Sequence, residues 1–256
     1  MGFLDKFKKE PKKEKPKKSG MHGSHWDTLV ESDTELQSIV MGTVEKSESK
    51  ESMKWSGDQK ITAFFSSGEH LKTCTITVNN QIWTAYPFIH DGIIHEVTIE
   101  DIDMWLNELE GQIQCGLGGT SFAFFDTMYF KNKDKYKNGE KYNFSLSAMA
   151  YSLAKAEPKT IKDKEGRELS TKGMAAFFPF QNGDIDDFRF QVPVKEVMEL
   201  KFENKDIYRI KAPLFRSNGS WDIDIYIYAS KSTTKGYVPQ AGDDISGIMW
   251  LQGYIK

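Results

Sequence analysis

The segment GDDISGIMWLQGYIK, residues 242 to 256, has a residue pattern that occurs twice in this chain. It begins with a glycine and a short polar entry, and it continues as a run of small, apolar and aromatic residues with hardly a charge. The segment GEKYNFSLSAMAYSL, residues 139 to 153, has the same pattern earlier in the chain. Runs of this kind, rich in apolar and aromatic residues and opened by a turn residue, are typical of strands. Both segments are therefore predicted to be β-strands.

The segments that precede these two strands also resemble each other. SFAFFDTMYF and the loop KNKDKYKN lead into the first, while DIDIYIYAS and the loop KSTTKGYVPQA lead into the second. In this alignment Gly139 matches Gly242 and Tyr151 matches Tyr254. Few other positions are identical, so two explanations remain open. Either the chain contains a duplicated unit, or two β-meanders share the same turn and strand chemistry.

The composition indicates a folded β protein. The 256 residues are 39% hydrophobic and 13% aromatic, which is enough to bury the core of one large β domain or of two small ones. Cys74 and Cys115 lie in apolar or β-like segments and form no CxxC pair, so we expect buried thiols rather than a disulfide framework. No apolar run approaches the length of a transmembrane helix, and the N-terminus has no pattern of a secretory signal. These features predict a cytoplasmic protein.

The amino-terminal tail has a charge opposite to that of the rest of the chain. Residues 1–20 contain eight lysines and three acidic residues, and the remaining chain contains 26 basic and 34 acidic residues. The tail is therefore predicted to be disordered. Its apolar residues and first lysines form a second candidate site, because an apolar turn followed by lysines can adsorb weakly to an anionic membrane. The candidate membrane residues are Phe3, Leu4, Phe7, Lys8 and Lys9. A solubilising tail is the alternative, and adsorption would place the protein at the inner face of the membrane.

The periodicity of the remaining chain predicts three further segments. Residues 21–57 form a polar linker with one short helix in WDTLVESDTELQSIV, capped at Asp27 or Thr28. Residues 58–155 form a first β unit, with a hairpin turn at Asn79 and Asn80 and a principal helix near residues 99–109. Residues 174–256 form a second β unit. In its strand WDIDIYIYA one face is apolar and the other is polar. The apolar face contains Trp221, Ile223, Ile225 and Ile227, and the polar face contains Asp222, Asp224, Tyr226 and Tyr228.

The predicted fold is mostly β, with antiparallel strands forming one or two barrels or a sandwich. Several short strands with a glycine-led final strand, over about residues 186–256, resemble the OB-fold, a small Greek-key barrel. The closing GDDISGIMWLQG also resembles uncharacterised bacterial proteins of no assigned activity. The first resemblance implies a barrel of the OB type. The second implies no chemistry.

The best candidate for a binding site is the segment YFKNKDKYKNGEKY, residues 129–142, in which lysines alternate with aromatic residues. Single-stranded nucleic acids bind to such mixtures, because lysines neutralise phosphates and flat rings stack on bases. The candidate residues are Tyr129, Lys131, Lys133, Lys135, Tyr136 and Lys137, together with Tyr226 and Tyr228 on the polar strand face. The leading interpretation is a non-enzymatic binding or scaffolding module for a protein or a single-stranded nucleic acid. The alternative is an ordinary solvated loop whose tyrosines seal the end of the barrel.

A hydrolase is the competing interpretation. Asp222 and Asp224 lie on the same strand face and could act as a pair of catalytic carboxylates. A solvated strand face is the simpler explanation of these aspartates. His90, Asp91 and His95 suggest a metal site, but their spacing matches no strong metal-binding motif. We therefore expect no metal and no cofactor.

Overall fold

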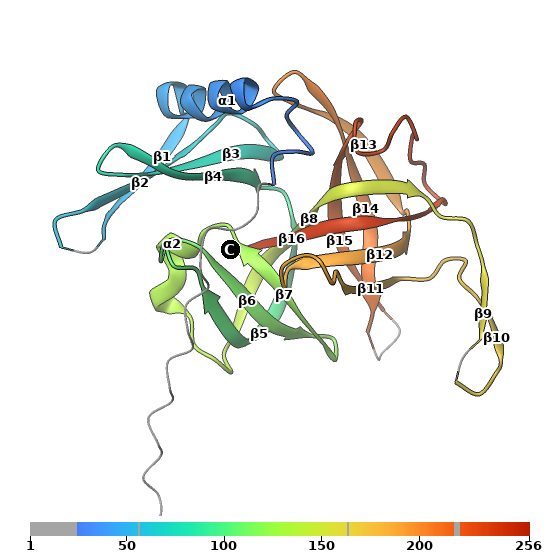
Figure 1. The fold of residues 1–256 in the computed structure, drawn as a ribbon. Helices are drawn as coiled ribbons and strands as arrows, with labels where there is room; N and C mark the ends of the chain where they lie inside the picture. The colour runs from blue at the N-terminus through green and yellow to red at the C-terminus, as the bar shows by residue number, and fades with distance from the viewer. Residues whose placement is uncertain (1–24, 56, 163, 218–220) are drawn as a thin grey trace, which may run out of the picture.

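The computed structural model describes residues 25–55, 57–162, 164–217 and 221–256, so the predicted tail and its candidate membrane residues lie outside the described part. The protein is mostly β, as predicted (Figure 1). The helices are α1 (Asp33–Lys46) and α2 (Tyr129–Asn132), which continues into a 3₁₀ turn, η1 (Lys133–Lys135). The strands are β1 (Ser49–Lys54), β2 (Lys60–Phe65), β3 (Leu71–Val78), β4 (Gln81–Ile89), β5 (Ile93–Met104), β6 (Gly111–Leu117), β7 (Thr120–Asp126), β8 (Lys141–Lys155), β9 (Thr160–Lys162), β10 (Glu168–Ser170), β11 (Ala176–Pro179), β12 (Asp187–Pro193), β13 (Glu196–Phe202), β14 (Lys205–Arg216), β15 (Asp222–Ser230) and β16 (Asp244–Ile255).

Five of these strands close into a barrel. The barrel order is β5, β6, β7, β16 and β8, and β8 closes it by pairing with both β16 and β5. All of these pairs are antiparallel except β7 with β16, which is parallel. The other strands of the same ten-stranded sheet extend from β8 and from β16, and the core inside the sheet is continuous. The two strands with which the sequence analysis began are therefore the centre of the fold.

These two central strands occupy equivalent places in two halves of the sheet. β8 and β16 pair with each other along almost their whole length. β7 runs parallel to β16 with Phe125 opposite Gln252, and β15 runs parallel to β8 with Tyr228 opposite Met149. Phe125 and Tyr228 are 103 residues apart in the chain, as are Met149 and Gln252. β7, which precedes β8 in the chain, therefore pairs with β16. β15, which precedes β16, pairs with β8 at the equivalent register.

The turns that lead into β8 and β16 show the same equivalence. Gly139 and Gly242, also 103 residues apart, have φ of 86° and 90°, a conformation that glycine adopts without strain. The Gly139 amide donates to the Ile99 carbonyl at 2.7 Å, and the Gly242 amide donates to the Val194 carbonyl at 2.9 Å. The similarity seen in the sequence is thus a repeat of structure, including its turns.

A separate four-stranded sheet, β1–β2–β3–β4, packs on the outside of the barrel (Figure 1). The predicted hairpin at Asn79 and Asn80 is confirmed. Both residues have positive φ, as the tight turn between β3 and β4 requires. α1 packs on β2 and β3, and it begins at the N-cap Ser32 rather than at the predicted Asp27 or Thr28. A second core, between the sheet and the barrel, includes Trp250, Phe125 and Tyr86.

The predicted helix near residues 99–109 is wrong, because that segment continues β5 and then turns. Val97 and Ile99 point into the barrel, and a β-bulge follows between Ile99 and Asp101. The bulge adds one residue, so the next inward residue is Ile102, three positions after Ile99. In the sequence, this three-residue spacing equals the spacing of apolar residues on one face of a helix. The principal helix of the described chain is α1.

The alternation predicted for β15 is largely confirmed. Ile223, Ile225 and Ile227 are buried in the barrel-side core. Two residues differ from the prediction: Trp221 is exposed, and Tyr228 is fully buried. Trp221 precedes the strand, and Tyr228 lies beneath the connection between β4 and β5, where its hydroxyl donates to the Asp91 carbonyl at 3.2 Å. Period-two alternation predicts the face of a residue but not what covers that face.

Candidate functional site

Two tyrosines of the 129–142 loop, Tyr129 and Tyr136, are buried and pack in the barrel core. Tyr129 and Tyr136 are 4% and 8% exposed. The Tyr136 hydroxyl donates to the Asp126 carboxyl at 2.6 Å, and the same carboxyl accepts from the Met128 amide at 3.0 Å. Burial raises the pKa of Asp126 to about 7. Neither ring is available as a stacking platform for a base.

The lysines of the loop have different surroundings. Lys131 forms an ion pair with Glu51 at 2.6 Å, and Lys135 donates to the Asn132 side chain at 3.0 Å. Lys133 donates to the Glu108 carbonyl at 3.1 Å, and Lys137 is exposed. Lys131 and Lys135 face a hollow, defined below, whereas Lys133 and Lys137 do not line it.

The polar face of β15 is occupied by contacts within the protein. The Arg209 guanidinium lies 4.5 Å from the centre of the Tyr226 ring. Asp222 and Asp224 both bind the Lys195 ammonium, at 2.8 and 2.6 Å, and hydrogen bonding to this lysine is the main cause that lowers the pKa of Asp222. Neither aspartate lines the hollow. Both carboxylates are therefore engaged in ion pairs with the same lysine.

The histidines of the suggested metal site are separated from each other. His95 Nε2 lies 2.7 Å from the Asp224 carbonyl oxygen, and His90 faces the hollow. Asp91 binds His70 and Arg209. In the ranges given above for the described chain, no group of three or more metal-binding side chains is present.

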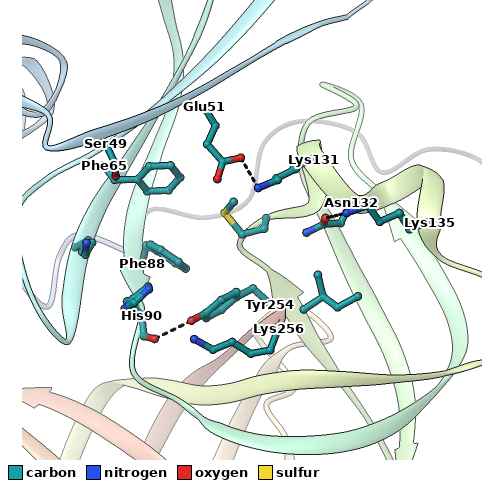
Figure 2. A pocket seen from close by; sticks show the side chains of 13 residues that line it. Ser49, Glu51, Phe65, Phe88, His90, Lys131, Asn132, Lys135, Tyr254 and Lys256 are labelled. Carbon is teal, nitrogen blue, oxygen red and sulfur yellow. Dashed lines mark hydrogen bonds and ion pairs between the residues drawn. The ribbon is translucent and has the colours of Figure 1, made fainter.

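A hollow of about 410 Å³ lies where the four-stranded sheet extends over the end of the barrel (Figure 2). The sheet, α2 with η1, and the end of β16 form its walls. Its lining residues are Ser49, Glu51, Phe65, Lys72, Phe88, His90, Met128, Lys131, Asn132, Lys135, Tyr254, Ile255 and Lys256. This volume is within the range of small-ligand sites.

Aromatic rings form one wall of the hollow. The centre of the Phe88 ring lies 5.6 Å from that of Phe65 and 5.2 Å from that of Tyr254. The His90 ring stacks on Tyr254 at 6.1 Å, and the Tyr254 hydroxyl donates to the His90 carbonyl at 2.8 Å. His90 is the exposed member of this cluster. The rings fix one another, so the wall is formed without a ligand.

The charge of the hollow is strongly positive. Among the described residues, four lysine side chains line it, Lys72, Lys131, Lys135 and Lys256, and the one carboxylate side chain is that of Glu51. Burial, followed by the nearby Lys256 and Lys72, lowers the pKa of His90 below its usual value of 6.5. A positive field with an aromatic wall suits an anion that also carries a flat or apolar group.

Two of the binding residues that the sequence predicted line this hollow, Lys131 and Lys135. His90, which the sequence suggested only as a metal ligand, lines it too. Met128 and Asn132 lie in the same part of the chain as these lysines. The remaining lining residues lie in, or directly after, β1 to β4 and β16, which are distant in the chain from the loop. The sequence signal for them is weak, since Lys72 and His90 are single polar residues next to apolar strands.

Comparisons with protein-family models, with curated protein sequences and with solved structures give no match. The function is therefore argued from the geometry of this chain. Within the described ranges, no helix has both the length and the apolar character needed to cross a membrane.

Proposed function

We propose that this protein is a non-enzymatic binding module whose ligand is a single-stranded nucleic acid, held in the hollow. The observation that carries the proposal is the combination of four lysines with the exposed His90 ring, which packs on the buried rings of the aromatic wall. Phosphates pair with lysines, and bases stack on aromatic rings whatever the sequence of the strand. The hydrolase alternative gains no support, because Asp222 and Asp224 are bound to Lys195.

The topology supports this proposal. With β5, β6, β7, β8 and β16 taken as strands one to five, strand one pairs with strands two and four, and strands three and five run parallel. The short helix α2 lies between strands three and four. We infer an OB-like barrel from this order, and barrels of that class include binders of oligonucleotides. The fold alone carries no function, so the argument rests on the hollow.

The proposed binding is local and weak. Glu51 neutralises Lys131, which leaves Lys72, Lys135 and Lys256 to meet phosphates. Each neutralised phosphate contributes about −0.7 to the slope of log affinity against log salt on single strands, so three lysines predict a slope of about −2. The acidic character of the chain outside the tail limits contacts beyond the hollow.

Charge reversal in the hollow should weaken binding. In the variant with Lys72→Glu, Lys135→Glu and Lys256→Glu, we expect affinity for a labelled mixed-sequence oligonucleotide to fall by more than about tenfold, because its phosphates lose their partners. Fluorescence anisotropy at low salt measures the change. The matched control reverses three exposed lysines that do not line the hollow, Lys137, Lys162 and Lys235. Equal losses in both variants would contradict a site in the hollow.

His90 should report occupancy of the hollow. A phosphate placed among Lys72 and Lys256 opposes the field that lowers the pKa of His90, so the pKa should rise when the oligonucleotide binds. Binding then takes up protons, and affinity should increase as the pH falls through the pKa that His90 has in the complex. NMR titration of the His90 ring with and without oligonucleotide measures this. An unchanged His90 pKa in the saturated complex would place the ligand elsewhere.

A protein partner is the outcome favoured if no oligonucleotide binds at low salt. The hollow would then accept an acidic segment of that partner, recovered by a pull-down that depends on the same three lysines. Adsorption to anionic membranes would involve the tail, which lies outside the described residues.

A further inference from the structure

Among the described residues, Glu51 supplies the one carboxylate side chain that lines the hollow, and it is paired directly with Lys131 (Figure 2). The Glu51 carboxylate and the Lys131 ammonium are 2.6 Å apart, and their side chains are 39% and 41% exposed. Both groups are therefore within reach of a ligand. Because a carboxylate repels phosphates, its presence at an anion site needs an explanation.

The ion pair joins β1 of the four-stranded sheet to α2 at the end of the barrel. Glu51 lies in β1, where its backbone pairs with Ala63 of β2. Lys131 lies in α2, whose position is set by the buried Tyr129 and Phe130. The two charges thus face each other because the sheet and the barrel end are fixed. A ligand must compete with Glu51 to use Lys131.

We propose that Glu51 makes the hollow selective for strand ends that carry a phosphate monoester over the internal phosphodiesters of a strand. This inference rests on the proposed function. An internal phosphodiester carries one negative charge, so exchanging it for the Glu51 carboxylate gains little. A terminal phosphate carries a charge of about −2 near pH 7, so it gains more from Lys131 together with Lys135 than the carboxylate does.

The test compares two oligonucleotides of one sequence, with a 5′-phosphate and with a 5′-hydroxyl, by fluorescence anisotropy. The wild type should bind the phosphorylated strand about tenfold more tightly, because the end phosphate adds the charge that displaces Glu51. The variant Glu51→Gln should bind the hydroxyl strand about five- to tenfold more tightly than the wild type, and most of the preference should disappear. Its salt slope should also steepen by about 0.7 as Lys131 becomes free.

The matched control is Glu96→Gln, which removes the same charge from an exposed ion pair with Lys141 that does not line the hollow. It should leave the preference unchanged. A wild type without preference, or a Glu51→Gln variant that binds like the wild type, would overturn the role of Glu51 while leaving the proposed function intact. Absence of binding to any strand would instead reject the proposed function. Competition by inorganic phosphate at the concentration of the phosphorylated strand would show recognition of free phosphate, and would also overturn the proposal.

Discussion

Between about pH 4 and about pH 7 the free energy of unfolding should fall by several kcal/mol, because two carboxyl groups are buried in the folded protein. Asp126 and Asp186 are 1% and 2% exposed. Burial raises the pKa of each from 3.8 to about 7. Asp126 accepts from Tyr136, and Asp186 accepts from the Trp250 indole N–H at 3.2 Å.

The sign follows from the two pKa values of each group. Between 3.8 and about 7 the folded protein holds a proton that the unfolded chain has released, so stability decreases as the pH rises through this window. Below the window both states are protonated, and above it both are ionised. A shift of about three pKa units corresponds to about 4 kcal/mol for each group as an upper limit.

Urea denaturation across this pH range measures the effect for the wild type and for Asp126→Asn and Asp186→Asn. Each asparagine removes one titrating carboxyl group, so the free energy of unfolding of each variant should depend less on pH. The gain in stability over the wild type should be larger above pH 7 than below it. The exposed Asp58→Asn is the control and should leave the slope as it is. A wild-type stability that does not depend on pH, or a slope that both variants preserve, would contradict the prediction.

Adding one methyl group at Gly247 should destabilise the fold by about 3 kcal/mol or more. Gly247 lies in β16, between Leu153 of β8 and Phe190 of β12. A Cβ atom at this position would overlap the carbonyl oxygen of Ser152, and it would lie 2.8 Å from the Ser152 carbonyl carbon. These atoms are backbone, so only movement of β8 could relieve the overlap. That movement would disturb the pairing on which both halves of the sheet depend.

Gly242→Ala is the matched control, since a Cβ atom at Gly242 would meet nothing within 4 Å. Its φ of 90° still carries strain, so we expect a loss of about 1 kcal/mol. The equivalent Gly139→Ala should lose a similar amount, because its φ is 86° and its surroundings are also open. Denaturation curves of the three variants provide the comparison. If Gly247→Ala loses no more stability than Gly242→Ala, the close approach of β8 and β16 is not limiting.

The sequence alone determined the features that depend on local chemistry. Asn79 and Asn80 tolerate positive φ, so their turn could be recognised between two β-rich runs. The apolar alternation of Ile223, Ile225 and Ile227 marked the buried face of β15, because successive side chains of a strand point to opposite sides. The similarity of the segments at Gly139 and Gly242 was also visible as matching turn and strand chemistry.

Only the tertiary structure decided which of these strands meet and which side chains remain exposed. Pairing of β8 with β16 joins residues about a hundred positions apart, and no local pattern encodes that choice. The bulge after Ile99 made a strand resemble a helix, because the added residue changes the spacing of the inward side chains. The sequence predicted Tyr136 as a stacking residue, but the barrel buries its ring. The hollow exists only because the four-stranded sheet extends over the barrel end, which brings Lys72 and His90 to Lys131. Burial and proximity depend on what packs over a residue, and that is a property of the whole fold.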